Sequence, residues 1–379
     1  MIPVNTLESV ESKQTFFVVV PPGFESLAYQ ELVLKGAIGP GFAPECRRFF
    51  KGGIELDLPS QQGFELINVS RIATRVLVRL EKFRCRDFPK LYKKTRGVSW
   101  AHWFSDCEGL EISVSARQSR LMNKKRISET VLKGVRDSKS WAEPSKKTSP
   151  YNLKHLFVRF ENDEVEFSLS LANEDLFKRG YKVLEAKAPL RENLAAGLFY
   201  SLYLAAGEPK KWSLLDLMCG SGTLLTEAAL FFSNQKILEK SVHRLYGFDQ
   251  ESTAVELAQK NLSAIEMSSC GHIQKFNFLK DHPSPTLQLA ADEILIGLSN
   301  PPYGVRIKWP APPKIFYAKM MAQYEEMGCS IYGFIVPRAQ KHLLPEPSMA
   351  LPFKNGGLDV IFHIYRTSKA LYSDNNKDL

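Results

Sequence analysis

The stretch "SLLDLMCGSGTLLTEAAL", residues 213–230, joins two apolar runs through a glycine-rich turn. The first run is short and apolar enough for a buried strand, and the second has the length and composition of a helix. Gly220 and Gly222 let the backbone turn tightly and let a ligand approach it closely. The stretch lacks both the G-K-[ST] of a P-loop and the G-x-G-x-x-G of a dinucleotide site. It predicts a strand–loop–helix unit with a ligand at the loop.

The rest of the second half continues this alternation. Apolar runs at "RLYGFD", "HIQKFNF", "EILIGLSN" and "SIYGFIVP" predict four more strands, and segments of helical pattern lie between them. Such alternation predicts a doubly wound, largely parallel sheet. Ligands of such sheets bind outside the carboxyl ends of the strands, where the strand order reverses. Polar residues that follow each strand are therefore candidate ligand contacts.

Three strand ends carry suitable side chains. Asp216 ends the first strand and Asp249 ends the second, where an acidic residue commonly accepts hydrogen bonds from ribose hydroxyls. Asp249 could equally cap the helix that follows it. Asn277 could contact an adenine edge and Phe278 a ring face, although alone these two fit a turn and a core position better. Together the strand ends predict a nucleoside-bearing cofactor.

The fourth strand ends in "LSNPPYGVRI", residues 298–307. Pro301 and Pro302 fix the backbone and hold Asn300 extended at the mouth of the sheet. The Asn300 amide oxygen and the Pro301 carbonyl can each accept one N–H of a planar amine, which positions its nitrogen for attack on a methyl group. Tyr303 can stack on a flipped base. The alternative is a simple turn that ends the strand, which the other strand ends disfavour.

The first half predicts a small α+β region with an uneven charge. The chain has a net charge of +9, and residues 116–150 alone contain ten basic and three acidic side chains. A localised basic field favours a polyanionic partner, most often nucleic acid, with a solvated helix face as the alternative. We take Lys124, Lys125 and Arg126 as candidate RNA contacts.

Composition and cysteine spacing disfavour a membrane protein, a secreted protein and a metal-binding protein. The apolar runs are shorter than a membrane span, and the N-terminal stretch lacks the pattern of a secretory signal, so we expect a cytoplasmic protein. The six cysteines form no C-x-x-C pair and no metal-ligand spacing with histidine. We therefore expect reduced thiols and no metal.

The motifs "DLMCGSGT" and "NPPYGVRI" resemble those of class I S-adenosylmethionine-dependent amino-methyltransferases. More narrowly, the chain resembles the bacterial THUMP-containing RNA guanine-N2 methyltransferases, the family of the large-subunit rRNA enzyme and its tRNA-modifying relatives. Further matches are "FFVVVPPGFESLAYQEL", "LFKRGYKVLEAKAPLRENLAAGL" and "FKNGGLDVIFHIYR". The resemblance implies an α/β protein whose C-terminal Rossmann-like class I methyltransferase domain follows an α+β THUMP-type RNA-binding region.

The resemblance also implies domain boundaries. We expect a ferredoxin-like α+β part at 1–60, a THUMP RNA-binding domain at 61–175, a linker that begins the cofactor pocket at 176–195, and the class I methyltransferase domain at 196–379.

The resemblance assigns roles to individual positions. The cofactor, S-adenosyl-L-methionine, would meet Asp216, Cys219, Gly220, Ser221, Gly222, Asp249, Asn277 and Phe278, with Pro189, Leu190 and Asn193 closing its pocket. The target base would meet Asn300, Pro301, Pro302 and Tyr303, and Arg306 would lie near substrate phosphates. Leu217 and Asn277 depart from the proline and aspartate usual in the family. We expect Asn277 to alter or weaken cofactor binding.

The leading interpretation is a methyltransferase that acts on the exocyclic N2 amine of a guanosine in structured RNA, 23S rRNA in preference to tRNA, with a part in rRNA processing. N-P-P-Y is shared with enzymes that methylate adenine N6, so an adenine-N6 methyltransferase of RNA or DNA is the alternative enzyme. A non-catalytic RNA-binding or ribosome-assembly factor is the alternative from another class.

Overall fold

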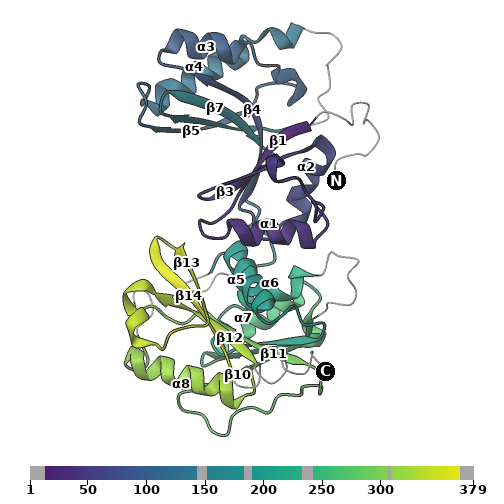
Figure 1. Cartoon of the computed structure of the whole chain (residues 1–379), viewed down its shortest axis with the longest axis vertical. Coiled ribbons are helices and arrows are strands. Elements are labelled where there is room, and N and C mark those ends of the chain that lie inside the picture. The colour runs from purple at the N-terminus through teal and green to yellow at the C-terminus, as the bar shows by residue number, and fades with distance from the viewer. Residues whose placement is uncertain (1–12, 143–151, 183–189, 233–241, 305–308, 368–379) are drawn as a thin grey trace. The chain divides into compact units, whose positions relative to one another are not determined.

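A computed structural model describes residues 13–142, 152–182, 190–232, 242–304 and 309–367 (Figure 1). The chain forms two compact units, each built on its own seven-stranded sheet. The first unit takes in residues 1–20, 36–69 and 73–176, and the second takes in 21–35, 70–72 and 177–379. Pro189 and Arg306, both predicted site residues, lie outside the described residues.

The first unit is an α+β structure. Its sheet has the order β2 (Arg47–Phe50), β3 (Gly53–Pro59), β1 (Lys13–Val19), β4 (Arg75–Arg84), β7 (Glu164–Ser170), β6 (His155–Glu161) and β5 (Glu111–Arg117). Every neighbouring pair is antiparallel except β5 and β6, which are parallel. Strands β6 and β7 form a hairpin through Asn162 and Asp163, both at positive φ, as a two-residue hairpin turn requires.

Two helices of the first unit lie side by side and run in the same direction (Figure 1). They are α3 (Phe88–Arg96) and α4 (Lys124–Arg136), and α2 (Ser60–Val69) packs beside β1 and β3. A Cβ on Gly134 would lie only 2.7 Å from Cβ of Thr95, so glycine is what lets α4 approach α3 this closely. That this unit is a THUMP-type RNA-binding region stays a prediction.

The second unit contains the doubly wound sheet. Its order is β10 (Gly271–Lys275), β9 (Val242–Asp249), β8 (Trp212–Asp216), β11 (Ile294–Ser299), β12 (Ile331–Pro337), β14 (Leu358–Arg366) and β13 (Met349–Asn355). The first five strands are parallel, and β14 is antiparallel to both of its neighbours. All five predicted strands and the α/β fold class are confirmed.

The alternating pattern of residues 358–366 predicts a strand at the sheet edge. The strand is present as β14, but the edge position is wrong, because β13 pairs with β14 and forms the edge itself. The segment 349–355 contains Pro352, which has no N–H to donate and therefore suits an edge strand.

Helices flank both units, with short 3₁₀ turns between elements. The second unit contains α1 (Glu25–Leu34), α5 (Glu192–Ala205), α6 (Thr223–Phe231), α7 (Ser252–Ser263) and α8 (Pro313–Glu326). The 3₁₀ turns are η1 (Pro44–Cys46), η2 (Trp100–His102), η3 (Lys139–Ala142), η5 (Ser268–Cys270) and η6 (Arg338–Leu343).

Helix α1 belongs to the second unit, although it lies within the predicted N-terminal part, 1–60. It packs against α5, where Gly197 leaves the room that the Phe24 ring occupies. The fully buried Glu31 carboxylate accepts hydrogen bonds from the Ser70 hydroxyl (2.7 Å) and from the backbone N–H groups of Arg71 (2.7 Å) and Ile72 (3.2 Å). Because a buried carboxylate needs such partners, α1 and segment 70–72 stay together.

Candidate functional site

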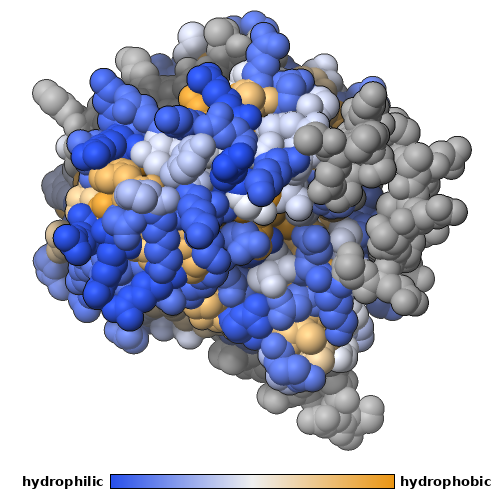
Figure 2. Space-filling view, turned by 90° about the horizontal axis from the view of Figure 1, so that it is seen from above, coloured by the Kyte–Doolittle hydropathy of each residue, from blue (hydrophilic) through white to orange (hydrophobic). Residues whose placement is uncertain are grey.

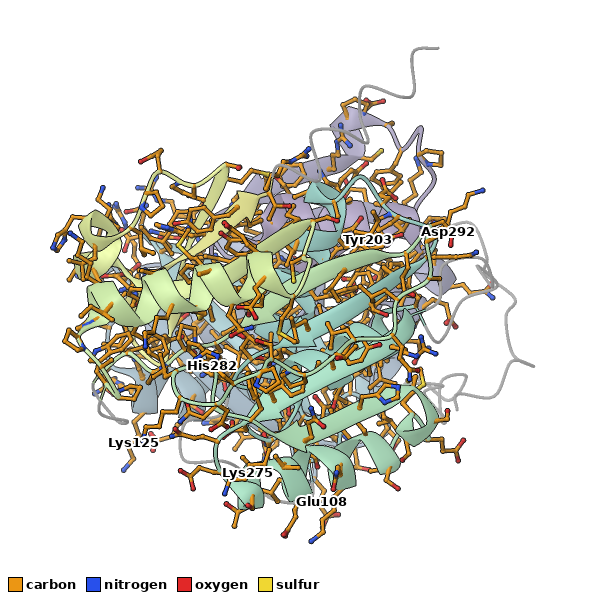
Figure 3. The ribbon with its side chains drawn as sticks, turned by 90° about the horizontal axis from the view of Figure 1, so that it is seen from below. Glu108, Lys125, Tyr203, Lys275, His282 and Asp292 are labelled. Atoms are coloured by element: carbon orange, nitrogen blue, oxygen red, sulfur yellow. The ribbon has the colours of Figure 1, made fainter. Side chains whose placement is uncertain are left out.

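The strand order of the second sheet reverses at β8. The chain continues from β8 to β9 on one side and enters β11 later on the other side. Because β8, β9 and β11 are parallel, their carboxyl ends meet at one edge of the sheet, at the position where such folds bind ligands. Figure 3 orients this edge: Lys275 ends β10 at the carboxyl side, and Asp292 precedes β11 at the amino side.

Asp216 lies at this reversal and is almost fully buried. Its Oδ1 accepts hydrogen bonds from the Ser299 hydroxyl (2.6 Å) and the Met218 N–H (3.1 Å). The Ser299 oxygen in turn accepts from the Leu217 N–H (3.1 Å) and contacts the Tyr324 hydroxyl (2.5 Å). Burial raises the pKa of Asp216 to about 7 although the two hydrogen bonds oppose the shift. Near neutral pH a nearby cation would therefore shift the ionisation of this carboxyl group toward the carboxylate.

The glycine loop after β8 has the backbone that the sequence predicts. Gly220 and Gly222 have φ of +53° and +76°, which glycine adopts without strain. A Cβ on Gly222 would lie 3.1 Å from Cβ of Ala258, whereas a Cβ on Gly220 would meet nothing within 4 Å. The loop is therefore packed against α7 at Gly222 and has open space in front of Gly220.

The side chains of Cys219 and Ser221, beside these glycines, are buried. The Ser221 carbonyl accepts a hydrogen bond from Asn261 Nδ2 (2.8 Å), which fixes the loop to α7. Burial raises the pKa of the Cys219 thiol, which disfavours its thiolate form.

Asp249 connects the glycine loop to the start of α7. Its Oδ2 accepts from the Gly220 N–H (2.9 Å) and its Oδ1 accepts from the Glu251 N–H (3.0 Å). One oxygen therefore serves the turn before α7, whose N-cap is Glu251, and the other serves the glycine loop. Burial raises the pKa of Asp249. A ribose contact stays a prediction.

Asn277 and Phe278 are both held by neighbouring groups. Asn277 Oδ1 accepts from the Leu279 N–H (3.0 Å), and its Nδ2 donates to Gln250 (3.0 Å). The Phe278 ring packs edge-on against Phe316 with centroids 5.5 Å apart. The first contact is an Asx turn. The second contact joins Asn277 to Gln250, the residue that follows Asp249. Contact of either side chain with an adenine stays a prediction.

Residues 300–304, which we call the Asn300 corner, are held together by hydrogen bonds. Asn300 Oδ1 accepts from the Tyr303 hydroxyl (2.6 Å), and the Tyr303 oxygen accepts from Asn355 Nδ2 (3.0 Å). Gly304, at φ +78°, lies so close to Trp309 that a Cβ would come within 2.4 Å of the indole nitrogen. The two prolines and this glycine leave the corner little freedom.

Of the linker residues, Asn193 and Leu190 lie within the described part of the chain, and both are buried. Asn193 Nδ2 donates to the Ile72 carbonyl at 3.4 Å. Lys182 donates to the Leu190 carbonyl (3.0 Å) and pairs with Glu192 (3.1 Å). These contacts fix the start of α5, and a role in closing a cofactor pocket stays a prediction.

Lys124, Lys125 and Arg126 form the first turn of α4 and are exposed. The structure adds exposed basic side chains on the adjacent α3, which the sequence analysis missed: Lys90, Lys93, Lys94 and Arg96. Arg126 lies over the Phe88 ring at 4.2 Å, so the two helices present one basic face. Figure 2, seen from above the α3 and α4 of Figure 1, shows a mainly hydrophilic surface.

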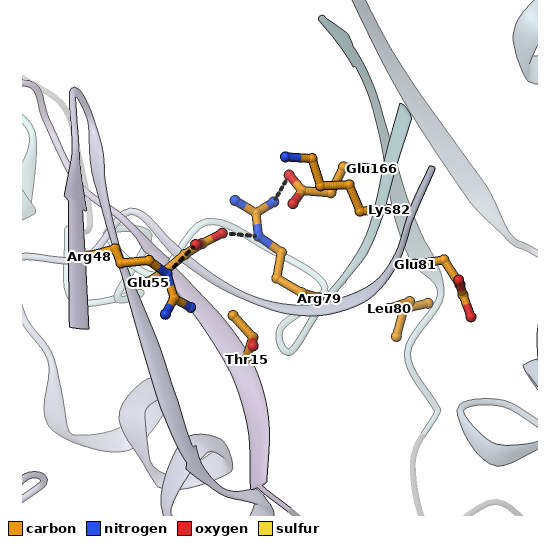
Figure 4. Close-up of a pocket in the computed structure, with 8 residues that line it drawn as sticks. All are labelled: Thr15, Arg48, Glu55, Arg79, Leu80, Glu81, Lys82 and Glu166. Atoms are coloured by element: carbon orange, nitrogen blue, oxygen red, sulfur yellow. Dashed lines mark hydrogen bonds and ion pairs between the residues drawn. The ribbon is translucent and has the colours of Figure 1, made fainter. Parts of the chain in front are cut away.

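A pocket on the first sheet is of a different kind (Figure 4). Arg79 pairs with Glu55 (3.1 Å) and Glu166 (2.8 Å), and Arg48 pairs with Glu55 (3.1 Å). Basic and acidic side chains balance along its lining, so it lacks the positive field that an RNA backbone requires. The candidate site therefore stays at the edge of the second sheet.

Three contributors to the site escaped the sequence analysis: Ser299, Trp309 and Asn355. Ser299 ends the strand before the N-P-P-Y motif, so its position was a usable signal. Asn355 and Trp309 carry no local signal, because they reach the site only through packing. Within the described residues, no group of three or more His, Cys, Asp or Glu could hold a metal, and no helix is long and apolar enough to cross a membrane.

The second unit has a doubly wound sheet with carboxylates at the ends of β8 and β9 and Asn-Pro-Pro-Tyr after β11. These features define its class as a Rossmann-like methyltransferase domain. Residues 179–344 match the model of the UPF0020 family, described as the RMKL-like methyltransferase domain. This part of the chain is therefore similar to an RMKL-like methyltransferase domain.

Known proteins with similar sequences agree with this assignment. The chain is 27% identical over 348 residues to the ribosomal RNA large subunit methyltransferase K/L of Cellvibrio japonicus, covering 80% of this chain and 44% of that protein. The corresponding protein of Saccharophagus degradans is 24% identical, covering 97% of this chain and 53% of that protein. The chain thus spans about half the length of these relatives, and the resemblance to the family of the large-subunit rRNA enzyme is confirmed.

A solved structure shares the fold at low identity. TrmN from Thermus thermophilus superposes with a TM-score of 0.64 at 16% identity, covering 93% of this chain and 100% of that chain. At this identity the likeness concerns the fold alone.

Proposed function

We propose that the protein is an S-adenosylmethionine-dependent RNA methyltransferase that modifies guanine N2 in structured RNA, 23S rRNA in preference to tRNA, in the cytoplasm. One observation carries the proposal: Asp216 and Asp249 end the neighbouring parallel strands β8 and β9, and the Asn300 corner follows β11, at the reversal of strand order. The name of the large-subunit rRNA relatives supports the choice of RNA.

The residues present fit the cofactor. S-adenosylmethionine supplies a methyl group on a positively charged sulfur, attached to an amino acid and an adenosine. Asp216 offers a carboxyl group whose ionisation a cation would favour, and the backbone is open in front of Gly220. Asp249 would accept hydrogen bonds from the ribose, and Asn277 with Phe278 would meet the adenine.

The Asn300 corner would prepare the amine. The lone pair of an exocyclic guanine amine is conjugated into its ring, which makes the nitrogen a weak nucleophile. Asn300 Oδ1 and the Pro301 carbonyl would each accept one N–H, hold the nitrogen toward the methyl group and reduce the conjugation. This is catalysis by positioning and electrostatics, and the methylated amine would lose its extra proton to water. Tyr303 would contact the base plane.

The basic face of α3 and α4 would bind the RNA backbone. Its lysine and arginine side chains are exposed on two parallel helices, and phosphate contacts of this kind position structured RNA without reading its sequence. Arg306 would add a phosphate contact near the target base.

Nucleoside mass spectrometry tests this function directly. Ribosomal RNA and tRNA, separated by size, are compared from cells with and without the gene. We expect one N2-methylguanosine to disappear from the large rRNA, and to return with the unaltered gene but not with its Asn300→Ala form.

Other outcomes favour the alternatives. Loss of N6-methyladenosine would retain the role of Asn300 and replace guanine by adenine as the target. Loss from tRNA alone would change the substrate. An unchanged set of modified nucleosides would favour a non-catalytic RNA-binding or ribosome-assembly factor.

A further inference from the structure

The hairpin between β13 and β14 fixes Asn355 in a defined place. Gly356 and Gly357 form its two-residue turn with φ of +56° and +86°, the positive pair that a type I′ turn requires. Asn355 ends β13 and pairs with Leu358 across the turn. The hairpin therefore presents the Asn355 side chain from a stiff backbone.

Asn355 is the first member of a directed chain of hydrogen bonds. Its Nδ2 donates to the Tyr303 oxygen (3.0 Å), and the Tyr303 hydroxyl donates its single proton to Asn300 Oδ1 (2.6 Å). Burial raises the pKa of Tyr303, so the hydroxyl remains a donor over the usual range of pH. Donation from Asn355 also polarises the hydroxyl and strengthens its bond to Asn300.

This direction determines which end of the Asn300 amide faces Tyr303. If the amide were flipped, its NH₂ would face a phenol oxygen that already accepts from Asn355, and the phenol proton would lose its acceptor. A half-buried donor that loses its partner is unfavourable, because the lost hydrogen bond is not replaced. Asn355 therefore favours the orientation in which the Asn300 oxygen is presented as an acceptor.

We propose that Asn355 is a positioning residue for methyl transfer, which acts through Tyr303 to hold the Asn300 amide oxygen toward the amine of the target base. The inference rests on the proposed function of Asn300. It gives the Tyr303 hydroxyl a role besides stacking, and it gives the C-terminal hairpin a part in catalysis.

Kinetics of a double-mutant cycle test the inference. Asn355→Asp replaces the donor by an acceptor that draws the phenol proton away from Asn300. We expect kcat to fall about tenfold while KM for S-adenosylmethionine changes less than twofold, since only the target amine is mispositioned. In a Tyr303→Phe background, the same change should lower kcat less than twofold further.

The control is Lys354→Ala, an exposed neighbour on the same strand that should leave kcat unchanged. Equal loss from Asn355→Asp in both backgrounds, or no loss in either, would overturn the inference while leaving the methyltransferase activity intact.

Thermal unfolding of the same four proteins gives a readout without RNA. If the contact chain exists, the double variant should lose less Tm than the two single variants combined, and strictly additive losses would overturn the inference. If the four proteins show this coupling in Tm but the wild type methylates no RNA, the result would instead count against the proposed function.

Discussion

The Ser299 hydroxyl donates a 2.6 Å hydrogen bond to Asp216 Oδ1, although the two residues are 83 positions apart. The same oxygen accepts from the Leu217 N–H (3.1 Å). Ser299 thus joins the carboxyl ends of β8 and β11 where the strand order reverses. These contacts therefore fix the glycine loop, which follows β8, relative to the Asn300 corner, which follows β11.

The first prediction concerns the pH dependence of stability. The pKa of Asp216 is about 7 in the folded chain against an ordinary value of 3.8. Between these values the folded form holds a proton that the unfolded form has lost, so the free energy of unfolding falls as pH rises, by at most about 1.4 kcal/mol per unit. Above about pH 7 this loss is complete. Asp216→Asn should remove the slope.

Urea unfolding at intervals from pH 4.5 to 8 measures this slope. Asp292→Asn, which alters an exposed carboxylate at the amino end of the sheet, is the control and should behave as the wild type. If wild type and Asp216→Asn show parallel pH profiles, Asp216 is ionised throughout the range.

The second prediction concerns the cofactor. Asp249→Ala removes the acceptor for Gly220 and Glu251 as well as the expected ribose contact. We expect the Kd for S-adenosylmethionine, measured by calorimetry, to rise tenfold or more because a charged hydrogen-bond acceptor is lost. Glu251→Ala, at an exposed neighbouring position, should change the Kd little. An unchanged Kd in Asp249→Ala would contradict the ribose assignment.

The third prediction separates chemistry from cofactor binding. Asn300→Ala removes the oxygen proposed to hold the target amine, so kcat for RNA methylation should fall about 100-fold or more. The Kd for S-adenosylmethionine should stay within about twofold. Asn68→Ala, an exposed asparagine on α2, is the matched control. Normal turnover by Asn300→Ala would remove the proposed mechanism.

The fourth prediction concerns RNA binding. Charge reversal to glutamate at Lys124, Lys125 and Arg126 should weaken binding to structured RNA and reduce the slope of log Kd against log salt concentration, because fewer phosphate contacts release counterions. Filter binding across a salt series measures both quantities.

Reversal at Lys210 and Lys211 is the control, because these residues precede β8 at the amino end of the sheet. A salt slope that is unchanged by the α4 variant, or lowered equally by the control, would make the basic face a solvated surface.

Much of the second unit could be predicted because its signals are local. Apolar runs of strand length located β8 to β12, and the glycines and prolines beside them marked the loops. The place of β13 and of helix α1 could not be predicted in this way. Pro352 interrupts the strand pattern of residues 349–355, so β13 is hard to recognise in the sequence. Helix α1 joins the second unit through the buried Glu31, whose partners lie about forty residues away.

By itself, the sequence determined which chemical groups follow each strand, since strand and loop preferences depend on near neighbours in the chain. Tertiary structure alone decided that Ser299 meets Asp216 and that Asn355, 52 residues from Tyr303, completes the Asn300 corner. It also decided the raised pKa of Asp216. Burial and long-range hydrogen bonds arise only when distant segments pack, because packing both removes water and supplies the partners.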